Sequence, residues 1–287
     1  MMNTHNLDLH MHSTVSDGTD TPEELILRVR EAKLELFALT DHDAVKGCER
    51  IRLALKEGDP SFIGGVEFSC KDEDGKYHIL GYGYDPASPS IVQLVEKSHG
   101  FRMKKVKARL SFLQEKFGFA FPQEEIDGLL ALDNPGKPHI GNLMVKYHFA
   151  QTKDEAINEY INQAKFHTEY IRPEEAIEGI LSGGGIPVLA HPAYGSGNEL
   201  ILDEQMDRRV QKLMGFGLQG MECFYSGFAP KLSGEMLSLA EKYHLYVTAG
   251  SDYHGKNKFV VLGKTYFEGD VLMPEGMRRF LTDVHIG

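Results

Sequence analysis

Seven short apolar runs, separated by stretches of helical periodicity, constrain the fold of this 287-residue chain most strongly. Their length and their content of β-branched and aromatic residues are typical of buried strands. Helix-period segments follow several of the runs, an alternation that is typical of βα units. The runs are Asn6–His10, Leu36–Thr40, Phe62–Phe68, Tyr77–Tyr82, Ile186–Ala190, Gly220–Phe224 and Tyr246–Ala249. The sequence therefore predicts an α/β fold, and its length permits one large barrel-like domain or two smaller units.

Three segments between these runs carry helix signals. Thr21-Pro22-Glu23-Glu24 offers an N-cap, a proline in the first turn and early acids. Arg172-Pro173-Glu174-Glu175 repeats this opening, and the glycines of 183–185 end the helix that it begins. Ser233–Tyr243 has the same apolar periodicity. We expect a helix in each of the three places.

A long stretch between the fourth and fifth runs has only helical periodicity. It extends from about Ser90 to Phe166 and includes a helical segment at Asp154–Ala164. A connection of this length needs structure of its own. We therefore expect a helical insertion domain over 90–166, with the barrel formed by 1–89 and 167–287.

Composition and charge exclude several classes of function. The net charge of −11 disfavours a protein that coats long nucleic acid, although bound metal ions can reverse the field within one pocket. Cys48, Cys70 and Cys223 are far apart, which fits a reducing compartment rather than a disulfide framework. Neither a secretory signal nor an apolar run long enough to span a membrane is visible. We expect a cytoplasmic protein; the oligomeric state stays open.

Residue types that bind metals gather at the ends of these runs. His10 and His12 follow the first run, and alternate residues of an extended chain place both imidazoles on one side. The other candidates are Asp17, His42, Glu67, His78, His191, Asp252 and His254. In βα barrels the strand ends converge at one face, so residues far apart in sequence can form one site.

Each of these residues also has a structural explanation. The motif HxH alone is weak, Asp17 suits a turn before Gly18, and Asp252 suits a helix cap. Asp41 and Asp43 beside His42 could orient its ring or could serve as caps. The repetition at equivalent positions favours a metal site, because burying so many polar groups without metal or partners costs several kcal/mol each.

The combined motifs resemble those of the polymerase-and-histidinol-phosphatase (PHP) family. The motifs are His10-Met11-His12-Ser13, Ser16-Asp17-Gly18, Thr40-Asp41-His42-Asp43, Gly65-Val66-Glu67, His78, Ala190-His191-Pro192 and Ser251-Asp252-Tyr253-His254. The resemblance implies a distorted (β/α)7 PHP barrel with an all-helical insertion domain. The position of the insertion resembles the TrpH-like subgroup, whose members act on 3′,5′-bisphosphate nucleotides or degrade RNA from its 5′ end.

The resemblance also implies two or three divalent metal ions. The first would be held by His10, His12, Glu67 and Asp252, the second by Asp17, His42 and His254, and the third by Glu67, His78 and His191. This mixture of imidazoles and carboxylates is compatible with manganese, zinc or iron and does not identify the metal. The expected nucleophile is a metal-bound hydroxide, so no catalytic side chain is assigned.

A basic stretch in the insertion offers contacts to substrate. Arg102 and Lys105 share one helix face and occupy places where TrpH-like proteins often carry arginines. Lys137 and His139 lie in a motif similar to one that starts a helix in the subgroup, and a helix N-terminus suits a phosphate. Tyr194 stands where many TrpH-like proteins have arginine, so a phosphate bound there would have no positive charge from this side chain. A solvated helix face is the alternative reading of the basic stretch.

We therefore expect a metal-dependent phosphoesterase that hydrolyses a 3′,5′-bisphosphate nucleotide or a 5′-phosphorylated oligoribonucleotide. Its partner would be a small phosphorylated substrate, a nucleotide or short RNA, rather than a long duplex or a membrane. The open alternatives are a histidinol-phosphate or other small-metabolite phosphatase, a metal-dependent deaminase or amidohydrolase, and a non-catalytic metal-stabilised PHP module. The aspartate–histidine spacing fits a deaminase poorly, and a degenerate module would have lost some of the ligands.

Overall fold

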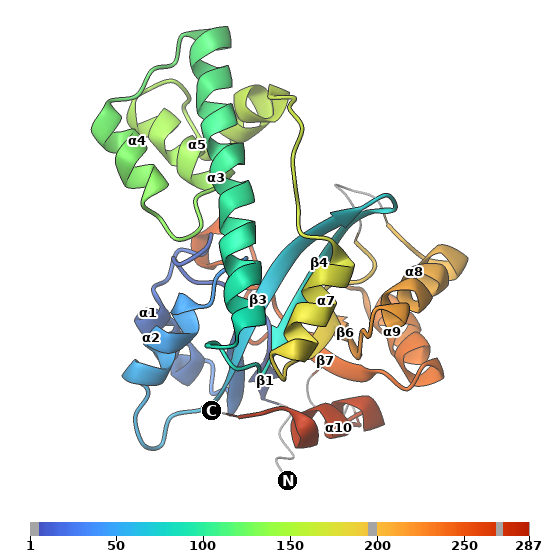
Figure 1. The fold of residues 1–287 in the computed structure, drawn as a ribbon. Coiled ribbons are helices and arrows are strands. Elements are labelled where there is room, and N and C mark those ends of the chain that lie inside the picture. Colours follow the sequence, from blue (N-terminus) through green and yellow to red (C-terminus); the bar gives the residue numbers. More distant parts are fainter. Residues whose placement is uncertain (1–5, 195–199, 268–271, 287) are drawn as a thin grey trace.

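A computed structural model describes residues 6–194, 200–267 and 272–286 of the chain. Its centre is a seven-stranded sheet in which the strands follow one another in sequence order (Figure 1). The strands are β1 (Leu7–Asp8), β2 (Leu36–Leu39), β3 (Ser61–Asp72), β4 (Gly75–Tyr82), β5 (Ile186–Leu189), β6 (Gly220–Tyr225) and β7 (Tyr246–Gly250). Each lies at one of the seven predicted apolar runs, so the predicted α/β class and the strand positions are confirmed.

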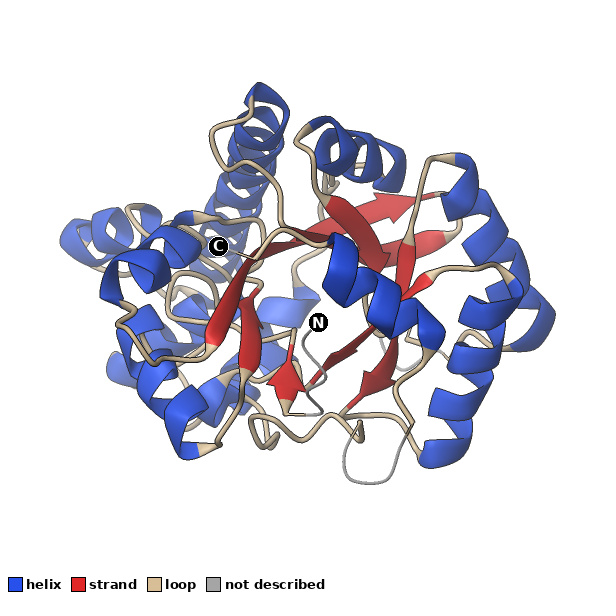
Figure 2. Cartoon of the chain, turned by 90° about the horizontal axis from the view of Figure 1, so that it is seen from below, coloured by secondary structure: helices blue, strands red, loops and turns tan. Residues whose placement is uncertain are grey.

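The sheet closes on itself through its first and last strands. The amide of Leu9, just after β1, donates to the carbonyl of Ala249 in β7 over 2.9 Å, and Met11 forms an isolated parallel bridge with Tyr253. Seen from below in Figure 2, the strands surround a common centre and the helices lie outside them. A closed sheet leaves no unpaired edge, and it brings the ends of distant strands into one small area.

The strand β4 breaks the parallel pattern. It pairs antiparallel with both β3 and β5, whereas the other neighbouring strands run parallel. A tight turn at Glu73–Asp74 makes β3 and β4 a hairpin, because no crossover helix is present to return the chain. The start of β4 therefore lies at the same end of the barrel as the carboxyl ends of the parallel strands.

The outer helices cover the sheet and begin close to the predicted signals. Thr21 caps α1 by accepting a hydrogen bond from the amide of Glu24, whose side chain accepts in turn from the amide of Thr21. The helix predicted after Arg172 is present as α7, and the one expected at Ser233 begins at Pro230. These helices are α1 (Pro22–Glu31), α2 (Lys46–Ala54), α7 (Pro173–Ser182), α8 (Asp203–Gly215), α9 (Pro230–Lys242) and α10 (Glu275–Asp283), with a 3-10 turn η3 (Gly255–Asn257).

The segment after β4 is helical, as its periodicity indicates, and stands to one side of the barrel (Figure 1). It contains α3 (Pro89–Phe117), α4 (Gln123–Leu130), α5 (Lys137–Lys146), α6 (Lys153–Glu155), the π-helical turn η1 (Ala156–Tyr160) and the 3-10 turn η2 (Ile161–Gln163). The first half of α3 packs its Ile91 and Leu94 against the barrel helix α7, and its second half enters a separate cluster around Val106 and Leu113. The division at residues 90 and 166 stays a prediction, since α3 belongs to both cores.

Among the residues that the structure describes, no helix combines the length and the apolar character needed to cross a membrane. The 29-residue α3 carries charged residues along much of its length, including Lys104, Lys105 and Lys107. Its role is to connect two hydrophobic clusters.

The separate cluster of the insertion gives a stability prediction. Leu113 is fully buried there, so Leu113→Ala should lower the free energy of unfolding by about 2–5 kcal/mol through lost burial and an unfilled cavity. Lys107 is exposed on the same helix, and Lys107→Ala should change stability by less than about 0.5 kcal/mol. Urea unfolding followed by circular dichroism measures both, and equal values would contradict the assignment of Leu113 to a packed core.

Candidate metal centre

The end of the barrel toward the insertion gathers the predicted ligand residues. His10 and His12 follow β1, on backbone that stays extended because it continues to pair beside the end of β7. Both imidazoles are completely buried on the inner side, while Met11 between them packs outward in a cluster with α1 and α2. The alternation predicted for this segment is therefore present.

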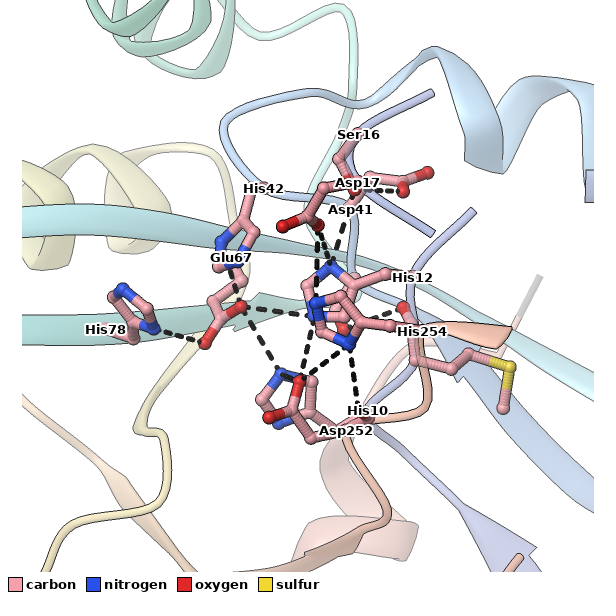
Figure 3. Close-up of polar contacts among 12 residues, drawn as sticks. His10, His12, Ser16, Asp17, Asp41, His42, Glu67, His78, Asp252 and His254 are labelled. Carbon is pink, nitrogen blue, oxygen red and sulfur yellow. Dashed lines mark hydrogen bonds and ion pairs between the residues drawn. The ribbon is translucent and has the colours of Figure 1, made fainter. Parts of the chain in front are cut away.

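One carboxylate lies at the middle of the cluster. The side chain of Glu67, on β3, is 1% exposed, and Figure 3 shows it among the imidazoles of His10, His12, His42 and His78. Its Oε2 atom lies 3.4 Å from His10 Nε2, 3.2 Å from His12 Nε2 and 3.0 Å from His42 Nδ1. Its Oε1 atom lies 2.8 Å from His78 Nδ1 and 3.2 Å from His191 Nε2. The reversed direction of β4 is what brings His78, near the start of that strand, to this place.

A second carboxylate, Asp252, follows β7. Its Oδ1 atom faces the cluster, at 3.5 Å from His10 Nε2, 3.3 Å from His12 Nε2 and 3.4 Å from His254 Nδ1. The backbone of Asp252 is in the left-handed region, with φ of 58°, and that of His191 is at 27°. Such conformations cost about 1–3 kcal/mol and often occur at functional sites.

In this cluster, three groups of residues each offer ligand-type atoms that all lie within 4.8 Å of one another. They are His10, His12, Glu67 and Asp252; His12, Asp17, His42 and His254; and His42, Glu67 and His78. The first group has the same members as the first predicted ligand set, and the other two share most members with the second and third. His191 is outside these groups but lies 3.1 Å from His78. The structure thus brings all nine predicted residues together, and their binding of metal stays a prediction.

Charge in the cluster shifts proton affinities in opposite directions. Burial alone would raise the pKa of the Glu67 carboxyl, but His42 and other nearby imidazoles hold it well below its usual range. Burial opposes protonation of His42, yet Glu67 and Asp17 raise its pKa to about 9. Burial and the neighbouring imidazoles lower the pKa of His12 to about 4. The carboxylates are therefore ionised at neutral pH, which is the form that binds cations.

Several buried atoms of the cluster have no hydrogen bond from any described residue. They are His10 Nε2, His12 Nε2, His42 Nδ1, Asp17 Oδ1 and Glu67 Oε2. A buried polar atom without a partner costs about 1–3 kcal/mol, so five at one point call for a shared partner. Imidazole nitrogens and carboxylate oxygens that face a common space are the donor set of zinc, iron and manganese. The residues present fit divalent ions.

The two aspartates beside His42 have other partners than its ring. Asp41 accepts hydrogen bonds from the hydroxyls of Ser13 and Ser16, at 2.7 and 2.6 Å, and so fixes the loop after β1. Asp43 lies 2.5 Å from the guanidinium of Arg102 in α3. Both aspartates therefore support the backbone around the cluster.

Three residues that contact the candidate ligands were not predicted from the sequence: Glu222, Tyr225 and Lys258. Glu222, on β6, lies 2.9 Å from His10 Nδ1 and accepts from the amide of His191 over 2.7 Å. Asp252 Oδ2 accepts hydrogen bonds from Tyr225 over 2.9 Å and from Lys258 over 2.6 Å. The one available signal was Glu222 itself, a carboxylate within the otherwise apolar strand sequence of β6.

A cavity of about 250 Å³ opens beside the cluster, between the barrel and the insertion. The predicted substrate residues Arg102, Lys105 and Lys137 lie in its wall. Five cations line it in total, and the walls also include residues of the cluster. The lining is Asp17, Ser69, Cys70, Lys76, His78, Arg102, Lys105, Arg109, Asn134, Gly136, Lys137, Pro138 and Tyr170. Lys76 and Tyr170 come from the barrel and were not foreseen.

Two predicted substrate residues lie elsewhere. His139 accepts a hydrogen bond from the amide of Gly136 over 3.1 Å and so closes the first turn of α5. Tyr194 donates to the carbonyl of Gly227 over 2.8 Å and packs against Tyr225. Neither is among the residues that line the cavity, so their contact with substrate stays a prediction.

Comparison with known proteins agrees with this arrangement. Residues 8–175 match the family model of the PHP domain. A 5′-3′ exoribonuclease from Haemophilus influenzae is 28% identical over 276 residues, which cover 94% of this chain and 98% of the relative. A 3′,5′-nucleoside bisphosphate phosphatase from Chromobacterium violaceum is 30% identical over 258 residues, 87% of each chain. A proposed metal-dependent phosphoesterase from Bifidobacterium adolescentis superposes with a TM-score of 0.80 at 27% identity, covering 96% of each chain.

The position of His42 gives a prediction for the metal-free protein. Folding raises the pKa of this ring from 6.5 to about 9, so the folded state keeps a proton that the unfolded state releases between those values. The stability from this group is complete below about pH 6.5 and is lost as the pH rises toward about 9. His42→Gln should flatten that part of the profile, as measured by urea unfolding in EDTA across this window. Parallel profiles for the two proteins would contradict the proposed proton on His42.

Proposed function

The chain belongs to the PHP domain family, and from this premise we propose that it hydrolyses a nucleotide phosphate ester with two or three bound divalent metal ions. The preferred substrates are a 3′,5′-bisphosphate nucleotide and a 5′-phosphorylated oligoribonucleotide. The observation that carries the proposal is the convergence of imidazole nitrogens and carboxylate oxygens, several without a hydrogen bond from any described residue, on one buried point directly beside a cavity lined by cations.

The residues that would hold the ions follow from the contacts around Glu67. One set is His10, His12, Glu67 and Asp252, the next is Asp17, His42 and His254, and the third is Glu67, His78 and His191. Manganese, zinc and iron all suit these donors. When bound, the ions would supply an activated water and offset the charge on the phosphoryl oxygens. The chain's own part is to hold the donors with their free atoms directed inward and to exclude bulk water from them.

The cavity supports a substrate with more than one phosphate. Lys76, Arg102, Lys105, Arg109 and Lys137 surround about 250 Å³ in a chain whose net charge is −11. Burial, together with Arg102 and Arg109, lowers the pKa of Lys105 to about 7, so the cations are crowded and an anion between them would relieve their repulsion. Arg102 pairs with Asp43 through Nη2 alone, so it keeps donors for a phosphate beside the three lysines and Arg109. One phosphate would then lie at the cluster and the next in the cavity.

The cysteines support a metal-based rather than a thiol-based reaction, and a reducing compartment. Cys48, Cys70 and Cys223 are unpaired and buried. Burial raises the pKa of Cys48 to about 12, and it raises the pKa of the other two well above the usual value. Thiols that stay protonated are poor nucleophiles. We place the protein in the cytoplasm on the strength of these free thiols.

Phosphate release by the manganese-loaded protein tests the proposed function. 3′-Phosphoadenosine 5′-phosphate, 5′-AMP, histidinol phosphate and a short 5′-phosphorylated RNA serve as parallel substrates. Rapid release from the bisphosphate, or shortening of the RNA, supports the proposal and chooses between its two forms. Preference for histidinol phosphate would establish a small-metabolite phosphatase instead, and inactivity on all four with metal bound would contradict the proposal.

Removing one donor should abolish turnover and leave the fold in place. His12→Ala and Asp252→Ala each delete an atom directed at the shared point, so we expect at least a hundredfold loss of activity, given that donor positions tolerate little change. The exposed His167→Ala is the matched control and should behave as wild type. Circular dichroism checks the fold, and full activity in either donor variant would refute the site.

The cavity lysines should matter most for the second phosphate. Lys137→Ala should raise KM for the bisphosphate by about tenfold, the effect of one charge-assisted hydrogen bond, and leave KM for an aryl phosphate nearly unchanged. Lys107→Ala, on an exposed position outside the cavity, should change neither value. Equal changes with both substrates would remove the case for a second phosphate subsite.

A further inference from the structure

The buried carboxylate of Glu222 is not among the nine ligand candidates. Its side chain is 0% exposed, and both of its oxygens have partners within the site. Oε1 lies 2.9 Å from His10 Nδ1, and Oε2 accepts from the backbone amide of His191 over 2.7 Å. We propose that Glu222 is a positioning residue that fixes the proton of His10 on Nδ1 and holds the backbone of His191. One carboxylate thereby positions two candidate ligands, which lie near different oxygens of Glu67. The proposal rests on the metal site of the proposed function.

Glu222 determines which nitrogen of the His10 ring carries the proton. An ionised carboxylate accepts hydrogen bonds and cannot donate, so a hydrogen bond at Oε1 requires the proton to be on Nδ1. In the neutral ring, which is the form that binds a metal ion, Nε2 then carries the free electron pair. That atom is buried, lies 3.4 Å from Glu67 Oε2 and 3.5 Å from Asp252 Oδ1, and has no hydrogen bond from any described residue. A histidine ligand commonly has this arrangement, with its other nitrogen donating to a carboxylate.

Glu222 also holds the backbone at His191. This residue is in the left-handed region, with φ of 27°, where a non-glycine residue needs support from its surroundings. Glu222 supplies it by accepting the amide hydrogen bond, and the rings of His10 and His191 lie nearly parallel with centroids 5.9 Å apart. Glu222 therefore connects the chain after β1 to the chain after β5.

The packing around Glu222 leaves it little freedom to move. Gly250 lies against it on β7, and an added Cβ there would collide with Cβ of His10 and with Oε1 of Glu222. The carboxylate thus lies between β6 and the chain carrying His10, where Oε1 reaches the His10 ring and Oε2 reaches the amide of His191. If Glu222 only stabilised the fold, its two oxygens would have no reason to contact candidate metal ligands, whereas both do, at His10 and His191.

Glutamine at this position separates the two roles of the carboxylate. Glu222→Gln keeps nearly the same shape but offers one accepting oxygen and one donating amide. If the oxygen stays on the amide of His191, the amide nitrogen faces His10 Nδ1, and the ring must move its proton to Nε2, where the metal should bind. If the amide group turns over, the amide of His191 loses its acceptor.

Metal binding measured apart from activity tests the proposal. Wild type, Glu222→Gln and the core control Met221→Leu are stripped of metal, titrated with Mn²⁺ against a chelating dye, and compared by bound-metal content and by melting of the metal-free form. Glu222→Gln should bind 10- to 100-fold more weakly, as for other residues that orient a histidine ligand, and Met221→Leu should bind as wild type. Equal affinity and content in wild type and Glu222→Gln would overturn the role of Glu222 and leave the proposed function standing. A wild type that binds no metal would overturn both.

A second measurement decides the matter if Glu222→Gln does not fold. In zinc-loaded wild type, ¹H–¹⁵N correlation spectra of the histidine rings, with His10 assigned by its loss in His10→Gln, report which nitrogen carries the proton. The proposal requires zinc on Nε2 and a protected proton on Nδ1. Coordination through Nδ1, or a His10 ring that stays uncoordinated while other rings bind zinc, would overturn it.

Discussion

The approach of five imidazoles to the single carboxylate of Glu67 is the interaction on which the rest of the site depends. A buried carboxylate is costly unless cations or several donors compensate it. Here the compensating groups come from β1, β2, β4 and β5, which are far apart in sequence but lie on either side of β3 in the sheet. The barrel and the cluster therefore depend on each other. The strands position the ligand residues, and the carboxylate of Glu67 is a common partner for the residues at the strand ends.

The antiparallel β4 and its hairpin with β3 depart from a regular barrel, and both bring residues toward Glu67 and the cavity beside it. The antiparallel β4 presents His78 at its beginning, and the hairpin extends β3 beyond the sheet so that Lys76 reaches the cavity. The insertion is attached at the same end: Arg102 pairs with Asp43, and Asn134 donates to the carbonyl of His42. Two residues that line the cavity, Arg102 and Asn134, therefore contact the segment that carries the candidate ligand His42. The same segment supports both the cavity and the metal cluster.

Much of this could be predicted from sequence because strands, helix starts and ligand chemistry have local signals. The apolar runs gave the strands within a few residues, the capping box at Thr21 gave the start of α1, and repetition of histidines and carboxylates at strand ends gave the nine cluster residues. The direction of β4 has no local signal, since Tyr77–Tyr82 reads the same whichever way the strand runs. Glu222 could not be predicted because the closed barrel brings it against His10, 212 positions away, and Lys76 could not because it reaches the cavity through the β3–β4 hairpin. Tyr194 and His139 were proposed as substrate contacts by analogy of position; in the structure His139 accepts a local hydrogen bond from Gly136, and Tyr194 donates to Gly227, 33 positions away.

Because α3 is continuous, it restricts which insertions and deletions its sequence can accept during evolution. The helix is anchored to the barrel near Leu94 and to the insertion near Val106, with no break between them. Each residue of an α-helix adds about 1.5 Å and turns the chain by about 100°, so one residue gained or lost between the anchors would swing the far half by more than a quarter of a revolution. The cations of α3 would then point away from the metal cluster. Insertions and deletions in this stretch can be tolerated only when their length is close to a whole number of helical turns. Only such changes keep the cations of α3 facing the metal cluster.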